Sequence, residues 1–213
     1  MKPTFLCLAS FFKGQDFLRA CKSEGCTVYL LTSKKLEYEF WPKEAIDEIF
    51  YMIGNEEGVW DEKEMIQGMS WLMKTRKIDR IVALDDFDVE NVARLREHFR
   101  LAGMGETPAR HFRDKLAMRV KAKEEGINVP EFTALFNDSE INEFADSVSP
   151  PWLLKPRAEA SAAGIKKLHS KDDLWQTIHS LGDDRDRYLI EKFAPGNVYH
   201  VDGLNLDDKV IFS

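Results

Sequence analysis

Short apolar segments alternate with amphipathic segments through the first hundred residues, and this alternation limits the folds open to the chain. The apolar segments are short and bounded by turn residues, as buried strands are, whereas the segments between them repeat apolar residues at helical spacing. Strands that alternate with helices form parallel sheets, because each helix returns the chain to the same end of the sheet. We therefore expect an α/β fold built on a doubly wound parallel sheet. The expected strands are Thr4–Ala9, Thr27–Leu31, one within Ile46–Ile53 and Arg80–Leu84, and the expected helices are Asp16–Ser23, Glu62–Arg76 and Asp88–Phe99.

From Gly103 onward the pattern changes and predicts an α+β unit with antiparallel strands. A short helix near Pro108 and a second over Asp114–Glu125 precede that unit. We expect three parts in the chain, a Rossmann-like substrate domain over 1–105, linker helices over 106–130 and the α+β unit over 131–213. In the last part we expect strands at Phe132–Leu135, Trp152–Lys155, Ile165–Leu168, Tyr188–Phe193, Val198–Leu204 and Val210–Phe212, and helices at Ser139–Ser147 and Lys171–Leu181.

The composition excludes several classes of protein. With a net charge of −7 and 44% apolar residues, the chain is too apolar for disorder and too acidic for a nucleic-acid scaffold or a polybasic membrane binder. No apolar run approaches the ~20 residues of a transmembrane helix. The three cysteines, Cys7, Cys21 and Cys26, match no zinc or redox spacing, which favours reduced thiols in a cytoplasmic protein.

The stretch from residue 150 to 168 carries the clearest sign of function. An apolar run ends in Lys155, small residues follow up to Gly164, and a second strand then returns. Small residues let backbone N–H groups approach an anion, and a lysine beside them adds a positive charge for phosphate. We interpret the stretch as a nucleotide phosphate site. The alternatives are a lysine that extends into water and a loop that only joins two strands.

Two loops follow the expected strands of the first domain, at the edge where parallel sheets bind ligands. Neither loop, over residues 10–14 or 85–88, carries the glycine-rich dinucleotide fingerprint. Asp85 and Asp86 are candidates for binding a substrate amine. Carboxylates at this position also stabilise a helix start, and we favour that interpretation.

Four elements occur in a fixed order along the chain. Asp114-Lys115 opens a helix, Lys155 ends a strand, Glu191-Lys192-Phe193 ends the next strand, and the segment GNVYHVD at 196–202 follows. This order resembles the ATP-grasp superfamily of ATP-dependent ligases, nearest to its branches that contain biotin carboxylase and the large subunit of carbamoyl-phosphate synthetase. The resemblance covers the whole chain. It implies a preceding substrate domain followed by the first ATP-grasp subdomain.

The resemblance implies an ATP site with specific residues. It assigns Lys115 and Lys155 to the phosphates, and the segment Glu191, Lys192 and Phe193 to the adenine edge through its backbone. It places Ser161 and Gly164 in the phosphate loop and His200 near the ribose. From the residues alone, we favour an ordinary solvated helix lysine for Lys115. The alternative for Glu191 and Lys192 is a surface ion pair, and the alternative for His200 is a structural histidine.

The resemblance also limits what we expect of the chain by itself. In this superfamily carboxylates and an asparagine of a second subdomain hold magnesium, and no such cluster precedes Ser213. We therefore expect part of a longer ligase that uses ATP, Mg²⁺ and a small carboxylate substrate, binds nucleotide, and does not turn it over alone. A homodimer is left open, and neither nucleic acid nor membrane is expected as a partner. The alternative functions are a non-catalytic nucleotide-binding or regulatory module and a doubly wound transferase.

Overall fold

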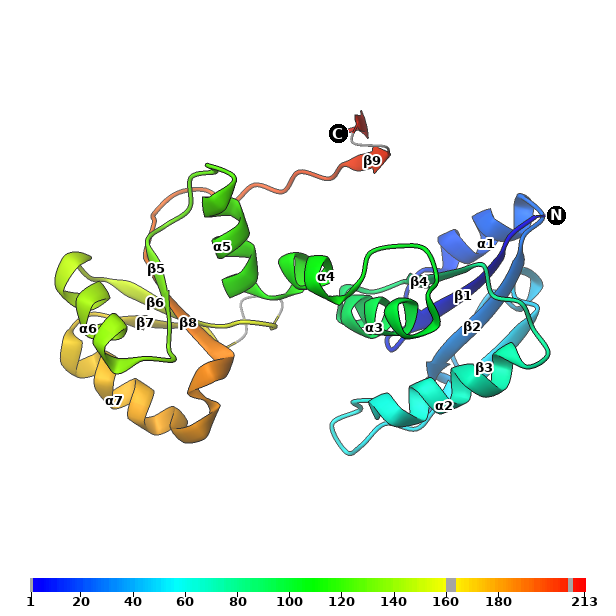
Figure 1. Cartoon of the computed structure of the whole chain (residues 1–213), viewed down its shortest axis with the longest axis horizontal. Helices are drawn as coiled ribbons and strands as arrows, with labels where there is room; N and C mark the ends of the chain where they lie inside the picture. Colours follow the sequence, from blue (N-terminus) through cyan, green and yellow to red (C-terminus); the bar gives the residue numbers. More distant parts are fainter. Residues whose placement is uncertain (1, 160–163, 207–208) are drawn as a thin grey trace. The chain divides into compact units, whose positions relative to one another are not determined.

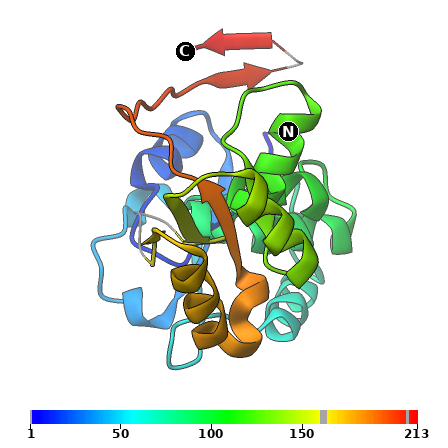
Figure 2. The same ribbon diagram turned by 90° about the vertical axis from the view of Figure 1, so that its left-hand side faces the viewer.

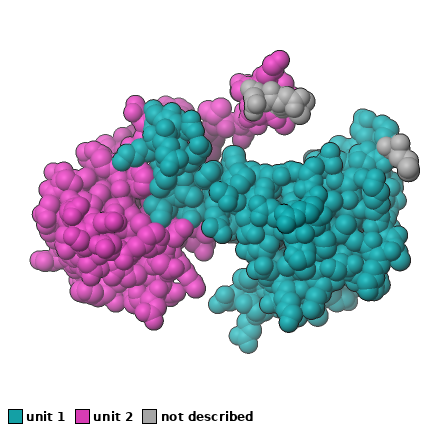
Figure 3. Space-filling model, in the orientation of Figure 1, with its two compact units in different colours: residues 1–127 teal, residues 128–213 magenta. Residues whose placement is uncertain are grey.

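The computed structural model describes residues 2–159, 164–206 and 209–213, and the chain divides into two compact units. The first unit comprises Met1–Ile127 and the second comprises Asn128–Ser213 (Figure 3). The helices α4 (Glu106–Arg113) and α5 (Lys115–Glu124), expected in a linker, fall within the first unit. No helix in the described part of the chain is both long enough and apolar enough to cross a membrane.

The first unit is built on a parallel sheet, as the sequence predicts. Its strands are β1 (Thr4–Ala9), β2 (Thr27–Ser33), β3 (Glu48–Met52) and β4 (Arg80–Ala83), in the order β3-β2-β1-β4 (Figure 1). Every strand pair in this sheet is parallel. Because β2 and β3 lie on one side of β1 and β4 on the other, the winding reverses between β1 and β4.

Helices cover both faces of the parallel sheet, so the fold is doubly wound. Alternate residues of β1 point to opposite faces. Leu6 and Leu8 pack in the core with α2 (Glu62–Met73) and α3 (Val89–Phe99), whereas Cys7 packs in the core with α1 (Gln15–Ser23). All three cysteines are buried free thiols. The short 3-10 helices η1 (Lys34–Leu36), η2 (Lys43–Ala45) and η3 (Asp86–Asp88) lie in the connections.

The second unit has an antiparallel sheet with helices on one face. The order of its strands is β5-β8-β6-β7, and Figure 2 shows the two α-helices of the unit, α6 and α7, in front of this sheet. The strands are β5 (Phe132–Ala134), β6 (Trp152–Pro156), β7 (Lys166–Leu168) and β8 (Tyr188–Lys192), and the helices are α6 (Asp138–Ser147), α7 (Lys171–Leu181) and the 3-10 helix η4 (Gly182–Arg187).

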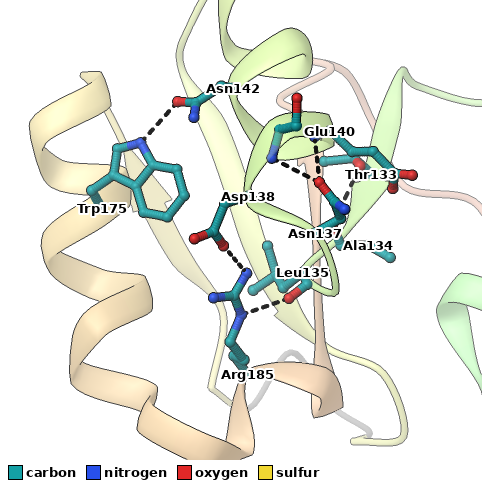
Figure 4. Close-up of polar contacts among 10 residues, drawn as sticks. Thr133, Ala134, Leu135, Asn137, Asp138, Glu140, Asn142, Trp175 and Arg185 are labelled. Atoms are coloured by element: carbon teal, nitrogen blue, oxygen red, sulfur yellow. Dashed lines mark hydrogen bonds and ion pairs between the residues drawn. The ribbon is translucent and has the colours of Figure 1, made fainter.

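Local hydrogen bonds fix where helix α6 begins and how it meets α7. Asn137 accepts from the backbone N–H groups of residues 139 and 140, at 2.8 and 3.2 Å, and so caps α6 (Figure 4). The guanidinium of Arg185 donates to the Leu135 carbonyl at 2.6 Å and to Asp138 at 2.6 Å. Trp175 of α7 donates to Asn142 of α6 at 3.2 Å, so the two helices lie side by side.

The core of the second unit lies between its sheet and these helices. Trp152 is 1% exposed, and its indole N–H donates to the Val148 carbonyl at 2.9 Å, so this large side chain has its polar group satisfied. The other buried members of this core are Leu135, Ile141, Phe144, Ala145, Leu154, Leu168, Leu174, Ile178 and Ile190.

The expected strand Val198–Leu204 is wrong. Residues 197–203 have no regular secondary structure, and β9 (Leu204–Leu206) begins where the expected strand ends. It pairs with β10 (Lys209–Phe212) in a two-stranded antiparallel ladder. The sequence alternates apolar and polar residues here, but a strand also needs a neighbour for its backbone, and none of the described residues pairs with 197–203.

Candidate functional site

Lys155 and Glu191 form an ion pair on the sheet of the second unit. In the ladder between β6 and β8, Leu153 lies opposite Glu191 and Lys155 lies opposite Leu189, so Lys155 and Glu191 are diagonal neighbours on one face. Only 16% of the Lys155 side chain and 4% of the Glu191 side chain are exposed. Lys155 therefore does not extend into water, and its ammonium is held at a defined place on the sheet.

The alternation of side chains separates this pair from the helix-packed core. Leu154 and Ile190 are fully buried among the helix-facing residues of the second unit. They therefore lie on the opposite face from Lys155 and Glu191, since each is the chain neighbour of one of them. Leu154 and Ile190 therefore do not face the space beside Lys155.

The segment after Glu191 keeps its backbone close to the sheet. The Lys192 N–H donates to the Glu131 carbonyl at 2.8 Å, and the Phe193 N–H donates to the Pro151 carbonyl at 3.0 Å. The Lys192 ammonium lies 3.7 Å from the carboxylate of Glu131, the residue before β5, so Lys192 pairs with Glu131 and not with Glu191. The 191–193 segment is thus held in an extended form.

Of the two phosphate-loop candidates, the structure describes Gly164 and not Ser161. Ser161 lies outside the described residues. Gly164 has a φ of +70°, and a β-carbon there would come within 2.8 Å of the Pro156 ring. Both observations require glycine at 164, so the chain returns to β7 through a turn that other residues fit poorly.

Lys115 is the first residue of α5, in the first unit. Asp114 separates α4 from α5 and caps the second helix, because its carboxylate accepts from the N–H groups of Leu116 and Ala117 at 2.9 and 3.4 Å. The Asp114 N–H in turn donates to the Arg110 carbonyl at 2.8 Å. This single-residue junction fixes the direction in which α5 leaves α4.

His200, the expected ribose contact, lies in the irregular segment 197–203 and is exposed. The strand Val198–Leu204 that was expected to hold it does not form at this position. The Asn197 amide of the same segment donates to the Tyr199 hydroxyl at 3.3 Å.

The acidic candidates of the first unit lie where the winding of the sheet reverses, and each has a partner. Asp85 lies 2.6 Å from the Lys13 ammonium, and its other oxygen accepts from the Phe87 N–H at 3.0 Å, which caps η3. Asp86 is 53% exposed and lies 2.9 Å from the guanidinium of Arg113. The structure thus brings the two loops together, and Asp85 performs the helix-start role that the sequence favours.

Asp88 is a further member of this cluster that the sequence did not single out as a site residue. One oxygen accepts from the Ser10 N–H at 2.8 Å, and the other has no hydrogen-bond partner among the described residues. Burial raises the pKa of Asp88, with Asp85 and Asp86 adding to the effect. Burial also opposes ionisation of Asp85, but hydrogen bonds from Lys13 and the Phe87 N–H outweigh it and lower the pKa of Asp85.

The described residues contain no group of three or more His, Cys, Asp or Glu side chains that could hold a metal ion. The Asp85–Asp88 cluster does not qualify, because its carboxylates already bind Lys13, Arg113 and backbone N–H groups.

Known proteins with similar sequences and folds are ligases. No family model matches the chain. It is 29% identical over 147 residues to the L-arginine-specific L-amino acid ligase of Bacillus subtilis, which covers 66% of this chain and 36% of the ligase. An L-amino acid ligase from Bacillus licheniformis has the same fold, with a TM-score of 0.67 at 16% identity, over 90% of this chain and 44% of that one.

The biotin carboxylase domain of Hydrogenobacter thermophilus 2-oxoglutarate carboxylase, crystallised with MgADP, ADP and bicarbonate, gives a TM-score of 0.68 at 20% identity. The match covers 91% of this chain and 44% of that domain. The chain thus spans less than half the length of each of these three proteins. The proteins that this chain resembles in sequence and fold are ATP-grasp ligases, and the share of them that it matches is consistent with their amino-terminal portion.

Proposed function

We propose that this chain binds ATP and is part of a ligase that activates a carboxylate. The observation that carries the proposal is the buried pair of Lys155 and Glu191 on a sheet with the ATP-grasp fold. In the proposed reaction a substrate carboxylate oxygen attacks the terminal phosphorus of ATP, and ADP leaves. An amine or another nucleophile then attacks the acylphosphate carbon, and inorganic phosphate leaves.

In this proposal the chain positions the nucleotide and neutralises its charge, because phosphoryl transfer needs little covalent chemistry from side chains. Lys155, held by Glu191, supplies one positive charge for the phosphates, and Lys115 supplies another. The extended segment from Glu191 through Lys192 to Phe193 presents backbone groups to the adenine edge. Gly164, with Ser161, belongs to the phosphate loop. His200 is retained as the ribose contact.

Mg²⁺ accompanies the nucleotide in this proposal and supplies charge neutralisation at the phosphates. The related biotin carboxylase domain was crystallised with MgADP. The described residues of this chain offer no matching cluster of metal ligands, so we assign none of them to the metal.

Asp86 is the better of the two substrate candidates. Its carboxylate is 53% exposed, whereas only 1% of the Asp85 side chain is exposed and Lys13 already neutralises it. A substrate amine reaches Asp86 by replacing the guanidinium of Arg113. Asp85 then acts by holding the loop in shape.

Calorimetric titration of the chain with a non-hydrolysable ATP analogue and Mg²⁺ tests the proposal. We expect Lys155→Ala to weaken binding at least tenfold, about 1.4 kcal/mol, because a phosphate loses a charge-assisted hydrogen bond. Lys171→Ala serves as the control, since this exposed lysine of α7 pairs with Asp146 and lies outside the candidate site. Unchanged affinity in a folded Lys155→Ala variant would contradict the proposal.

A second variant protects the test against misfolding, because Lys155→Ala removes the ammonium that pairs with the buried Glu191 carboxylate. Lys115→Ala changes a partly exposed residue at the start of α5 and leaves the Lys155–Glu191 pair intact. We expect it too to weaken analogue binding. We further propose that the chain alone does not turn over ATP, so phosphate release at the rate of an intact ligase would refute that part separately.

A further inference from the structure

The Lys167 ammonium lies over the ring of Phe193, 3.9 Å from the ring centroid. Lys167 is the middle residue of β7, the last strand of the β5-β8-β6-β7 sheet, and Phe193 directly follows β8. Because β6 lies between β7 and β8, the two side chains together bridge about 10 Å, twice the ~4.8 Å spacing of neighbouring strands. The contact therefore joins two segments that lie on opposite sides of β6.

Both side chains lie on the face of the sheet that carries the Lys155–Glu191 ion pair. Lys167 is directly opposite Leu153, and Leu153 is directly opposite Glu191, so these three side chains point the same way. Phe193 is two residues beyond Glu191 in an extended segment, so its ring points to this face as well. The contact thus belongs to the face of the proposed nucleotide site and not to the helix-packed core.

The positive charge of Lys167 is directed to the ring. Its ammonium has no carboxylate partner in the described part of the chain, whereas the Lys155 ammonium pairs with Glu191. A cation within ~6 Å of a ring centroid is attracted by the negative face of the ring. Lys167 is exposed and Phe193 is half-buried, so the contact gives the ring a preferred position at the surface of the sheet.

The two joined segments belong to different parts of the proposed nucleotide site. Strand β7 begins two residues after Gly164, where the chain returns from the phosphate loop, and the 191–193 segment is assigned to the adenine edge. β7 is a three-residue strand at the edge of the sheet and pairs with β6. Its place relative to the 191–193 segment therefore rests on few bonds, to which the contact of Lys167 with Phe193 adds one.

We propose that Lys167 is a positioning residue of the nucleotide site, which acts through the Phe193 ring and sets the affinity for the adenosine part of the ligand. This inference rests on the proposed function. The ammonium holds the ring, and the ring keeps the 191–193 backbone in the extended form that meets the adenine edge. Without the ammonium, binding has to order this segment, and ordering costs affinity. Lys167 touches neither the base nor the phosphates.

Titrations with two ligands test this role. Calorimetry with the non-hydrolysable ATP analogue and Mg²⁺ reports the whole nucleotide, and ¹H–¹⁵N shifts during titration with adenosine report the part that lacks phosphate. We expect Lys167→Met to weaken both about threefold, the factor that corresponds to one exposed cation–π contact. Lys167→Arg should restore both affinities, because a guanidinium keeps the attraction to the ring.

Lys166→Met is the matched control. It removes the same charge from the same strand, but Lys166 is opposite Leu154 and points to the other face, so both affinities should stay unchanged. Phe193→Leu supplies a second, independent variant. It should weaken both ligands by a similar factor, and adding Lys167→Met to it should cause little further loss, because the contact is already absent.

The outcomes separate this inference from the proposed function. If a folded Lys167→Met variant binds adenosine as the wild type does, the positioning role is overturned. Weaker binding of the ATP analogue alone would then show a direct phosphate contact, and unchanged binding of both ligands would show a merely structural one. Neither of these results affects the proposed function. Failure of the wild type to bind the ATP analogue would overturn the proposed function and this inference with it.

Discussion

The ion pair of Lys155 and Glu191 predicts an uneven cost for removing either partner. Lys155→Met removes the ammonium beside a carboxylate whose side chain is 4% exposed, whereas Glu191→Gln removes the carboxylate beside an ammonium whose side chain is 16% exposed. Breaking a buried pair costs about 3–5 kcal/mol, because the remaining charge stays away from water. We expect Lys155→Met to cost about 3 kcal/mol. Glu191→Gln should cost about 2 kcal/mol, since the flexible lysine stem can carry its charge to solvent.

The double variant Lys155→Met/Glu191→Gln isolates the interaction. With both charges removed, no unpaired ion remains, so the double variant should be more stable than the sum of the single changes implies. We expect a coupling free energy of about 2 kcal/mol from this cycle, within the usual range for residues in contact. The pair itself is then worth less than either single change suggests, because each single change includes the penalty of an isolated charge.

Urea unfolding followed by ¹H–¹⁵N spectra measures the free energy of unfolding of the second unit, in which the ion pair lies. A chain of two units does not unfold in one step, so a probe of the whole chain would mix two transitions. The Leu154 and Ile190 amides lie in the paired strands β6 and β8 and report the second unit alone. Single changes that each cost less than about 0.5 kcal/mol, or a coupling below that value, would refute the argument.

Three further predictions concern the first unit. Burial raises the pKa of Asp88, so the folded state keeps the carboxyl proton to higher pH than the unfolded chain does, and the stability that this proton confers is lost as pH rises through the folded pKa. In urea titrations, the stability of Asp88→Asn relative to wild type should therefore rise from pH 4 to 7. Gly14→Ala should lower the free energy of unfolding by about 3 kcal/mol in thermal unfolding, because φ is +87° and a β-carbon would lie 2.6 Å from the Leu84 side chain. The control Gly126→Ala, with φ +73° and no atom near the added β-carbon, should cost about 1 kcal/mol. Arg96→Met should cost about 2–4 kcal/mol in chemical unfolding, because the guanidinium donates to the buried Ile81 carbonyl through two of its nitrogens; a cost under about 1 kcal/mol would contradict this.

Much of the fold could be predicted from the sequence because its signals are local. Helix α7 occupies the predicted range Lys171–Leu181, since Ser170 caps its start by accepting from the Asp173 N–H at 3.1 Å and Gly182 follows its end. The parallel strands could likewise be predicted, because each is a short apolar run between turn residues. Neither signal depends on a partner elsewhere in the chain.

The errors arose where a distant partner decides the outcome. The alternating residues of 198–204 form no strand, since strand formation depends on a neighbour that the local pattern does not reveal. The contact of Lys13 with Asp85 joins residues far apart in sequence, so the local pattern did not reveal it. The face that carries Lys155 could be deduced by alternation from Leu154, but its pairing with Glu191 needed the strand register.

The junction at Asp114 places Lys115 where a helix tolerates a positive charge poorly. The N-terminal end of a helix carries a partial positive charge, so a lysine in the first turn opposes it by a few tenths of a kcal/mol. Asp114 offsets part of that repulsion, and an anion bound at the helix start would relieve the rest. Lys115→Glu should therefore stabilise the unliganded chain while weakening its affinity for phosphates, so at this position local stability and ligand binding favour opposite charges.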